Sequence, residues 1–373
     1  MNSMLKRMRQ DFNVYVGAET GVLKGLHLNQ KAVINKNFNN LQSLERGQEI
    51  TSMIWGNEEQ EEIMMGLHNQ TIKVFDIGIK AYTSAREIKV GEGPIVSLAK
   101  WNDVTVSAVK SGQITVWHSD ETKEINALKS GEFLSRMRQD HQSPNMIATG
   151  GKENDLQLWD LNKPEEPIFK AKNIKPDMVQ LRVPVWVSDM TFLKEPNCIA
   201  LATRHCHVRM YDHKRQRRPV VNFEWEESPF TSITSVADKS QVVVGTAHGR
   251  MGCFDLRMNK PEHPVRIFKS FAGAVRDIVV HPHLPLVFSV ALDRFLRVHH
   301  LETGKLIHKE YLKSRLNCVL VRDDFEEGDL LPTRGKPKRK WMERKMEMEE
   351  EMGYDSSEES CEKVRKIEDD EVW

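Results

Sequence analysis

The chain has 373 residues, a formal net charge of zero and a hydrophobic fraction of 39%. This composition is typical of a globular protein and excludes a wholly disordered one. No apolar run approaches the roughly 20 residues of a membrane-spanning helix, and the charged start of the chain lacks the apolar stretch of a secretory signal. We therefore expect an intracellular protein without a membrane segment.

Seven copies of one pattern recur along the chain, which favours a repeated small unit over separate domains. Each copy has a strand of small and apolar residues, a tight turn, and a second strand that ends in an apolar or aromatic residue and a polar one. The copies begin at Val14, Ile63, Val104, Met146, Cys198, Val242 and Leu286. Alignment gives one equivalent position to Leu26, Phe75, Trp117, Trp159, Tyr211, Phe254 and His299, with gaps of 49, 42, 42, 52, 43 and 45 residues. This period is typical of the blades of a WD40-type β-propeller.

Further strands flank the copies and complete blades of four strands. Strands with β-branched residues precede the copies, for example from Ile50, Ile95 and Phe230. Weaker strands follow, for example from Pro167, Pro219 and Lys305, where Pro and Lys are tolerated at an outer edge.

The first copy lacks a preceding strand, whereas the stretch 315–321 is a strand without a copy of its own. Pairing the two would close the ring and remove an open sheet edge. The sequence therefore predicts an all-β, seven-bladed propeller over residues 13–321, closed by a C-terminal inner strand. Residues 1–12 are an N-terminal extension, and residues 322–373 are a disordered charged tail.

Most blades depart from the ordinary WD40 repeat at one position. The Asp six residues before the terminal aromatic is present only as Asp293. The other blades carry Thr20, Asn69, Ser111, Glu153, His205 and His248 there. We therefore expect apolar packing, rather than a buried polar network, to hold most blades.

Basic side chains are expected at one end of the ring, where the turns within the copies meet the connections between blades. This top rim carries Arg136, Lys152, Arg182, Arg204, Arg250, Arg276, Arg294 and Arg315. One hypothesis is that they bind an acidic peptide or helix of a partner, or an RNA phosphate, through planar bidentate contacts. The alternative is that the arginines tie neighbouring blades together through backbone carbonyls. The sequence leaves both open.

A second basic run, Lys214, Arg215, Arg217 and Arg218, is expected in an outer connection on the opposite face. It could contact RNA phosphates, or it could be a solvated loop, and it has no interleaved aromatics for base stacking. The long connection 171–183 could also carry a partner contact. Trp186, just inside the next strand, could be a surface anchor, but a tryptophan at such a position is more often a core residue, which is the prediction here.

The tail has 18 acidic and 11 basic residues, a net charge of −7, and few aliphatic residues. Such a segment is predicted to be disordered. Its basic cluster of Lys336, Lys338, Arg339 and Lys340 is a candidate nuclear import signal. Three serines among acids, Ser356, Ser357 and Ser360, are candidate phosphorylation sites for an acidophilic kinase.

Nothing in the sequence favours an enzyme. Phosphate-loop, nucleophile-elbow and metalloprotease motifs are absent, and no cofactor is expected. The five cysteines lack a Cys-x-x-Cys pair, which predicts reduced thiols and no metal; His205 and His207 alone do not make a site. A propeller enzyme would need ionisable groups that converge in the central channel.

Four segments, 136–173, 181–186, 274–300 and 311–318, resemble the WD repeat-containing protein 74 family of nucleolar ribosome-assembly factors. The resemblance extends from about Val14 to Val321. It implies a location in the nucleus and nucleolus and a scaffold for pre-rRNA processing and maturation of the large-subunit precursor. The implied partners are pre-ribosomal proteins, rRNA as a further candidate, RNA exosome-associated factors, and an AAA-type ATPase that assists release. The chain would be a monomer within this larger assembly.

The alternative function is that of an adaptor in another nuclear pathway, such as ubiquitin ligation or RNA decay.

Overall fold

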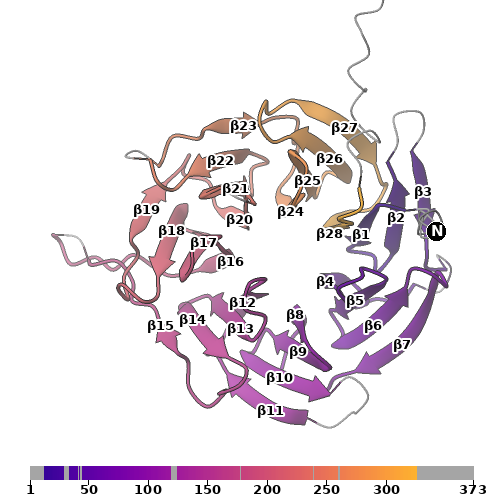
Figure 1. Ribbon diagram of the computed structural model, residues 1–373, viewed down its shortest axis with the longest axis horizontal. Helices are drawn as coiled ribbons and strands as arrows, with labels where there is room; N and C mark the ends of the chain where they lie inside the picture. The colour runs from indigo at the N-terminus through magenta and orange to yellow at the C-terminus, as the bar shows by residue number, and fades with distance from the viewer. Residues whose placement is uncertain are drawn as a thin grey trace, which may run out of the picture. The chain divides into compact units, whose positions relative to one another are not determined.

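The computed structural model describes residues 12–325, except 29–32, 41, 43, 119–123, 177, 238, 259–260 and the side chains of 124–126. Its strands form seven antiparallel sheets of four strands, arranged as blades around a centre (Figure 1). The sheets confirm the seven-bladed propeller. None of the described residues belongs to an α-helix.

Each blade runs from an inner strand at the centre to an outer strand at the edge (Figure 1). Blade 1 contains β28 (Leu316–Val321), β1 (Val14–Ala18), β2 (Leu23–His27) and β3 (Ile34–Asn37). Blade 2 contains β4 (Ile50–Trp55), β5 (Glu62–Leu67), β6 (Thr71–Asp76) and β7 (Ala81–Glu87). Blade 3 contains β8 (Ile95–Trp101), β9 (Val104–Val109), β10 (Gln113–His118) and β11 (Glu124–Lys129).

The remaining blades follow in chain order. Blade 4 contains β12 (Leu134–Gln139), β13 (Met146–Gly151), β14 (Asn154–Asp160) and β15 (Phe169–Lys170). Blade 5 contains β16 (Val187–Phe192), β17 (Cys198–Thr203), β18 (His207–Asp212) and β19 (Val221–Glu224). Blade 6 contains β20 (Phe230–Ser235), β21 (Gln241–Thr246), β22 (Met251–Asp255) and β23 (Arg266–Phe268). Blade 7 contains β24 (Val275–Val280), β25 (Leu286–Ala291), β26 (Phe295–His300) and β27 (Leu306–Tyr311).

The ring closes as the sequence predicts. β28 pairs with β1 in antiparallel register, so that Val14 lies opposite Val321 and Val16 opposite Val319. The ordered chain extends past the predicted boundaries at both ends. Phe12 is buried, and Phe325 is buried against Phe288 with ring centroids 5.6 Å apart.

Each inner strand carries a β-bulge directly after its first residue. In β4, for example, the register shifts between Ile50 and Ser52, and β24 shifts between Val275 and Asp277. An extra residue on one strand changes which side chains share a face. The first and fourth residues of an inner strand, such as Ile50 and Met53, therefore both enter the apolar core between blades, and the third residue turns toward its neighbours around the centre.

Polar side chains of the inner strands bridge every boundary between neighbouring blades. Thr51, Thr231 and Asn317 donate to the backbone carbonyl of the first residue of the next inner strand, at 2.5–3.0 Å. Ser97, Asp189 and Asp277 accept from the backbone N–H of the fourth residue of the next inner strand, at 3.0–3.3 Å. The boundary between blades 4 and 5 is bridged by Arg138, which donates to Asp189.

A second set of polar ties lies two residues before the repeat's terminal position, on the third strand of a blade. Five residues there reach back to the connection that leaves the preceding blade: Lys24, Lys73, Gln157, Arg209 and Arg297. Lys24 Nζ, for example, donates to Leu312 O at 2.7 Å. Buried polar groups of this kind stabilise only when they are paired. Polar ties therefore add to the apolar packing that was expected to hold most blades.

Ending the chain at Arg315 should abolish cooperative unfolding. Without β28, the edge of β1 is unpaired and the apolar face of Val14 and Val16 is exposed. We expect aggregation and no sharp transition in thermal unfolding followed by circular dichroism. A chain that ends at Phe325 keeps all described strands and should unfold like the full chain. A sharp, unshifted transition in the shorter chain would contradict the role assigned to closure.

Candidate functional site

The top end of the ring has one backbone hydrogen bond in each blade that fixes two residues beside the mouth of the central channel. The N–H at the turn between the second and third strands donates to the carbonyl of the residue before the inner strand. Lys152 N donates to Phe133 O at 3.0 Å, and Arg204 N donates to Trp186 O at 2.8 Å. The equivalent pairs in the other blades are Glu19 and Arg315, His68 and Glu49, Lys110 and Pro94, Ala247 and Pro229, and Leu292 and Ala274.

Four of the eight predicted top-rim cations have an acidic partner. Arg136 Nε lies 3.4 Å from Asp189 Oδ1, Arg182 pairs with Glu153 at 3.3 Å, and Arg315 pairs with Glu19 at 3.5 Å. The fourth is Arg250, which pairs with Glu226. Their charges are balanced within the protein.

The other four, Lys152, Arg204, Arg276 and Arg294, form no ion pair with any of the described residues. Arg294 donates to the Tyr311 hydroxyl at 3.3 Å. Burial and the charge of Arg276 both lower the pKa of Arg204. Positive charge that has no ion-pair partner among the described residues favours binding of an anionic ligand.

Trp186 organises two of these cations. Lys152 Nζ lies 5.2 Å and Arg204 Cζ lies 5.7 Å from the centroid of its ring, both within the range of cation–π attraction. The ring of His205 lies edge-on at 6.4 Å. Trp186 is only partly buried, so the prediction that it is a core residue is wrong.

Phe133, which sequence reasoning missed, lies at the same position in blade 4 as Trp186 in blade 5. Its side chain is 56% exposed, and its φ is +54°. A bulky residue in the left-handed region is strained, and exposing its ring to water adds a further cost. The only sequence signal is its position directly before the inner strand.

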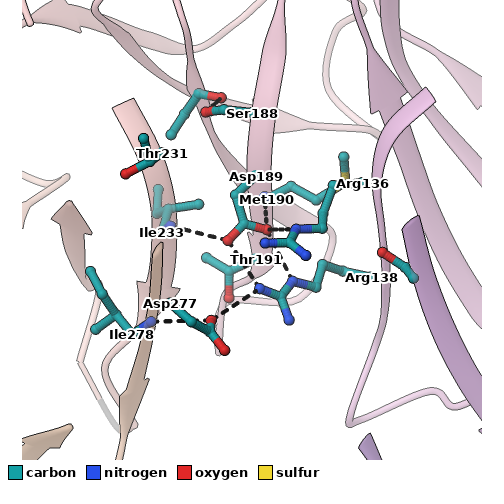
Figure 2. Close-up of polar contacts among 12 residues, drawn as sticks. Arg136, Arg138, Ser188, Asp189, Met190, Thr191, Thr231, Ile233, Asp277 and Ile278 are labelled. Atoms are coloured by element: carbon teal, nitrogen blue, oxygen red, sulfur yellow. Dashed lines mark hydrogen bonds and ion pairs between the residues drawn. The ribbon is translucent and has the colours of Figure 1, made fainter. Parts of the chain in front are cut away.

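A compact ionic cluster lies on the inner strands of the ring (Figure 2). Arg138 of β12 binds Asp189 of β16 through two hydrogen bonds, Nε to Oδ1 at 3.0 Å and Nη2 to Oδ2 at 2.9 Å. The same Nη2 lies 3.9 Å from Asp277 Oδ1 of β24. With Arg136, the cluster has two positive and two negative groups, and it links strands of blades 4, 5 and 7.

The arginines determine the charge state of Asp189. Its complete burial alone would raise the pKa of its carboxyl, but Arg138 and Arg136 hold that pKa below its usual value. Burial instead raises the pKa of Asp277 despite the same arginines. Ionisable groups therefore do converge in the channel, but they neutralise one another and bind backbone N–H groups. This arrangement joins blades 4, 5 and 7.

Sequence reasoning assigned Arg136 to partner binding, with blade-to-blade contacts as the alternative. The structure gives Arg136 an inward position with a side chain only 17% exposed. It ties blade 4 to blade 5, although through a carboxylate rather than through a backbone carbonyl.

The basic run of β18–β19 lies in the predicted connection, but part of it packs against blade 4. Arg217 Nε donates to Lys170 O at 2.7 Å, and Arg218 Nε donates to Asn173 O at 3.3 Å. Lys214 and Arg215 remain exposed, with only their backbone N–H groups bonded to Asp212. Two of the four candidate RNA-contacting residues are thus used to join neighbouring blades.

Other sequence hypotheses find no geometry within the described residues. No three His, Cys, Asp or Glu side chains among them gather as metal ligands. No helix in the described part is long and apolar enough to cross a membrane. The import cluster (Lys336, Lys338, Arg339, Lys340) and the serines (Ser356, Ser357, Ser360) lie outside the described residues.

Comparison with known proteins gives relatives over most of the chain, although no family model matches. The chain is 38% identical to WD repeat-containing protein 74 of Bos taurus over 84% of this chain and 83% of that protein. It is 37% identical to the Homo sapiens protein of the same name, with the same coverage. It is 27% identical to ribosome biogenesis protein NSA1 of Saccharomyces cerevisiae (strain ATCC 204508 / S288c), over 64% of this chain and 61% of that protein.

Changing Asp189 to Asn should lower the free energy of unfolding by about 3–5 kcal/mol, because it leaves Arg138 and Arg136 without their countercharge. Urea unfolding measures this. Since the folded-state pKa of Asp189 is lowered, its contribution is complete above the ordinary value of 3.8 and is lost as pH falls through the lowered pKa. The difference between wild type and variant should therefore shrink in acid.

Asp277→Asn is the matched control for this cluster. Its raised pKa means that the folded protein disfavours its charged form. We expect a smaller cost at neutral pH than for Asp189→Asn. Equal stability of wild type and Asp189→Asn would show that the cluster does not hold the blades.

Proposed function

Since the chain belongs to the family of WD repeat-containing protein 74, we propose that it is a non-catalytic propeller scaffold in ribosome biogenesis. It would act in the nucleolus, in pre-rRNA processing and maturation of the large-subunit precursor. Pre-ribosomal proteins and rRNA would be its partners there, within a larger assembly in which the chain is a monomer.

The relatives supply the pathway in this proposal. Ribosome biogenesis protein NSA1 carries its role in its name and aligns with 61–68% of this chain in several fungi. We also propose two finer steps on the basis of the family resemblance. An AAA-type ATPase would assist release of the chain, and RNA exosome-associated factors would contact it. Fold alone would not select this pathway from others that use propellers.

The observation that carries the proposal is the set of cations at the top end that have no acidic partner among the described residues. Lys152, Arg204 and Arg276 present positive charge on a rigid frame. The arginines of the inner-strand cluster are paired with Asp189 and Asp277, whereas these cations form no ion pair with any described residue. Such a surface suits capture of an anionic partner rather than turnover of a small substrate.

Double charge reversal, Arg204→Glu with Arg276→Glu, should remove the chain from precursor large subunits in sucrose-gradient sedimentation of cell extracts. The melting temperature should change little, because neither guanidinium forms an ion pair among the described residues. Lys305→Glu, an exposed change in the connection between β26 and β27, is the control and should still sediment with the particles.

Two results of that experiment would contradict the proposal. The wild-type chain could sediment free of precursor large subunits, which would favour an adaptor of ubiquitin ligation or RNA decay. Alternatively, the double variant could sediment like wild type, which would show that Arg204 and Arg276 are not needed for binding to the particle. Arg136→Glu should instead lower the melting temperature, because Arg136 contacts buried Asp189.

The import hypothesis is tested by changing Lys336, Lys338, Arg339 and Lys340 together to Ala. We expect a fluorescently tagged chain to move from the nucleus to the cytoplasm, because importers recognise compact basic clusters. Ala at Lys363, Arg365 and Lys366 removes charge elsewhere in the same tail and should leave the location unchanged. Nuclear retention of the first variant would refute this assignment.

A further inference from the structure

The mouth of the channel is not uniform around the ring. In blades 3 to 5 the two fixed positions of each blade carry Pro94 and Lys110, Phe133 and Lys152, and Trp186 and Arg204. We call the cations and aromatic residues among them, Lys110, Phe133, Lys152, Trp186 and Arg204, the basic-aromatic arc. In blades 6 and 7 the same positions carry Pro229, Ala247, Ala274 and Leu292. Cations and aromatic rings therefore alternate in blades 4 and 5, and uncharged residues occupy blades 6 and 7. Blades 1 and 2 carry Glu19, Arg315, His68 and Glu49 at these positions.

The backbone holds the arc in place. Each cation's N–H is bonded to the carbonyl of the residue before an inner strand, at 2.8–3.1 Å. Gly151, next to Lys152, has no room for a side chain, since an added Cβ would meet Phe133 O at 2.1 Å. A partner would therefore meet a surface whose backbone is already ordered, which lowers the entropy cost of binding.

Phe133 is the most unusual member of the arc. Its ring is 56% exposed at a backbone conformation that Gly or Asn adopts more easily. Strain of this kind persists where function requires the side chain. The exposed ring offers an apolar contact between Lys110 and Lys152, both of which are exposed.

We propose that the basic-aromatic arc binds an acidic peptide segment of an assembly partner, with an apolar side chain against Phe133 and carboxylates on Lys152 and Arg204. This inference rests on the proposed function and names the class of ligand for its top-end surface. Arginine offers a carboxylate two parallel hydrogen bonds, and an exposed aromatic ring supplies the apolar anchor typical of protein interfaces.

The arc fits a peptide better than single-stranded RNA. RNA binding of this type uses open aromatic faces on which bases stack, but Lys152 and Arg204 already lie over the ring of Trp186. Two acidic residues are sequence neighbours of arc members. Glu132, which is exposed, precedes Phe133, and Glu153, which pairs with Arg182, follows Lys152. They would repel a continuous phosphate backbone, whereas a peptide can place its carboxylates away from them.

Peptide selection on the full-length chain tests the proposal. A phage-displayed random peptide library is enriched on the wild-type chain after depletion on the double variant Lys152→Glu, Arg204→Glu. We expect enriched sequences with an aromatic or aliphatic residue flanked by Asp or Glu. No enrichment over the depleted variant, or enrichment of basic sequences, would overturn the proposal.

The best enriched peptide is then labelled and titrated by fluorescence anisotropy. Lys152→Glu and Arg204→Glu should each weaken binding by about tenfold or more, and Lys305→Glu, an exposed change between β26 and β27, should leave it unchanged. A labelled uridine oligonucleotide should bind the variants at least as tightly as it binds the wild-type chain. Arc-dependent binding of that RNA, without peptide binding, would identify the ligand as RNA and refute the peptide.

Phe133→Asn separates a binding role from a structural one. Asn tolerates the left-handed conformation, so the melting temperature should stay equal or rise, whereas peptide affinity should fall by about tenfold. Loss of stability with unchanged affinity would contradict the role given to Phe133. Sedimentation of the wild-type chain with precursor subunits tests the proposed function separately, because it does not depend on which ligand the arc takes.

Discussion

The propeller depends on polar bridges at the boundaries between its inner strands. Apolar packing joins neighbouring blades in a general way, but hydrogen bonds from inner-strand side chains fix the angle and height of one blade against the next. Asp189 illustrates this, because it receives Arg138 from one blade and the Ile233 N–H from another. The bulge after the first residue of each inner strand makes these contacts possible, since it turns the third side chain toward its neighbours.

The fold was largely predictable because its signal is local and repeated. Seven copies at a regular spacing, and an unpaired strand at each end, require no knowledge of distant contacts. The buried ionic cluster was not predictable in this way. Arg138, Asp189 and Asp277 are far apart in the sequence, and only the ring brings them together. For Arg136 the sequence consequently left open both partner binding and a tie between blades, and its ion pair with Asp189 of β16 favours the tie.

The same limit applies to the candidate site. Counting basic residues at the top end gave eight candidates, but it could not show which of them have carboxylate partners. Glu153 neutralises Arg182, whereas adjacent Lys152 turns to Trp186. The difference depends on side-chain direction within one turn. Phe133 was not identified from the sequence, because the pattern of apolar residues does not show whether an aromatic side chain is exposed or buried.

Closure by β28 has a consequence for biosynthesis. β1 is made first, yet its partner strand is separated from it by all the other blades. While the ribosome is still translating those blades, the inner edge of β1 has no native neighbour. Contacts of such long sequence separation form slowly, and unpaired edges of nascent chains invite aggregation. A chaperone that shields this edge until translation is nearly finished would therefore raise the yield of folded protein.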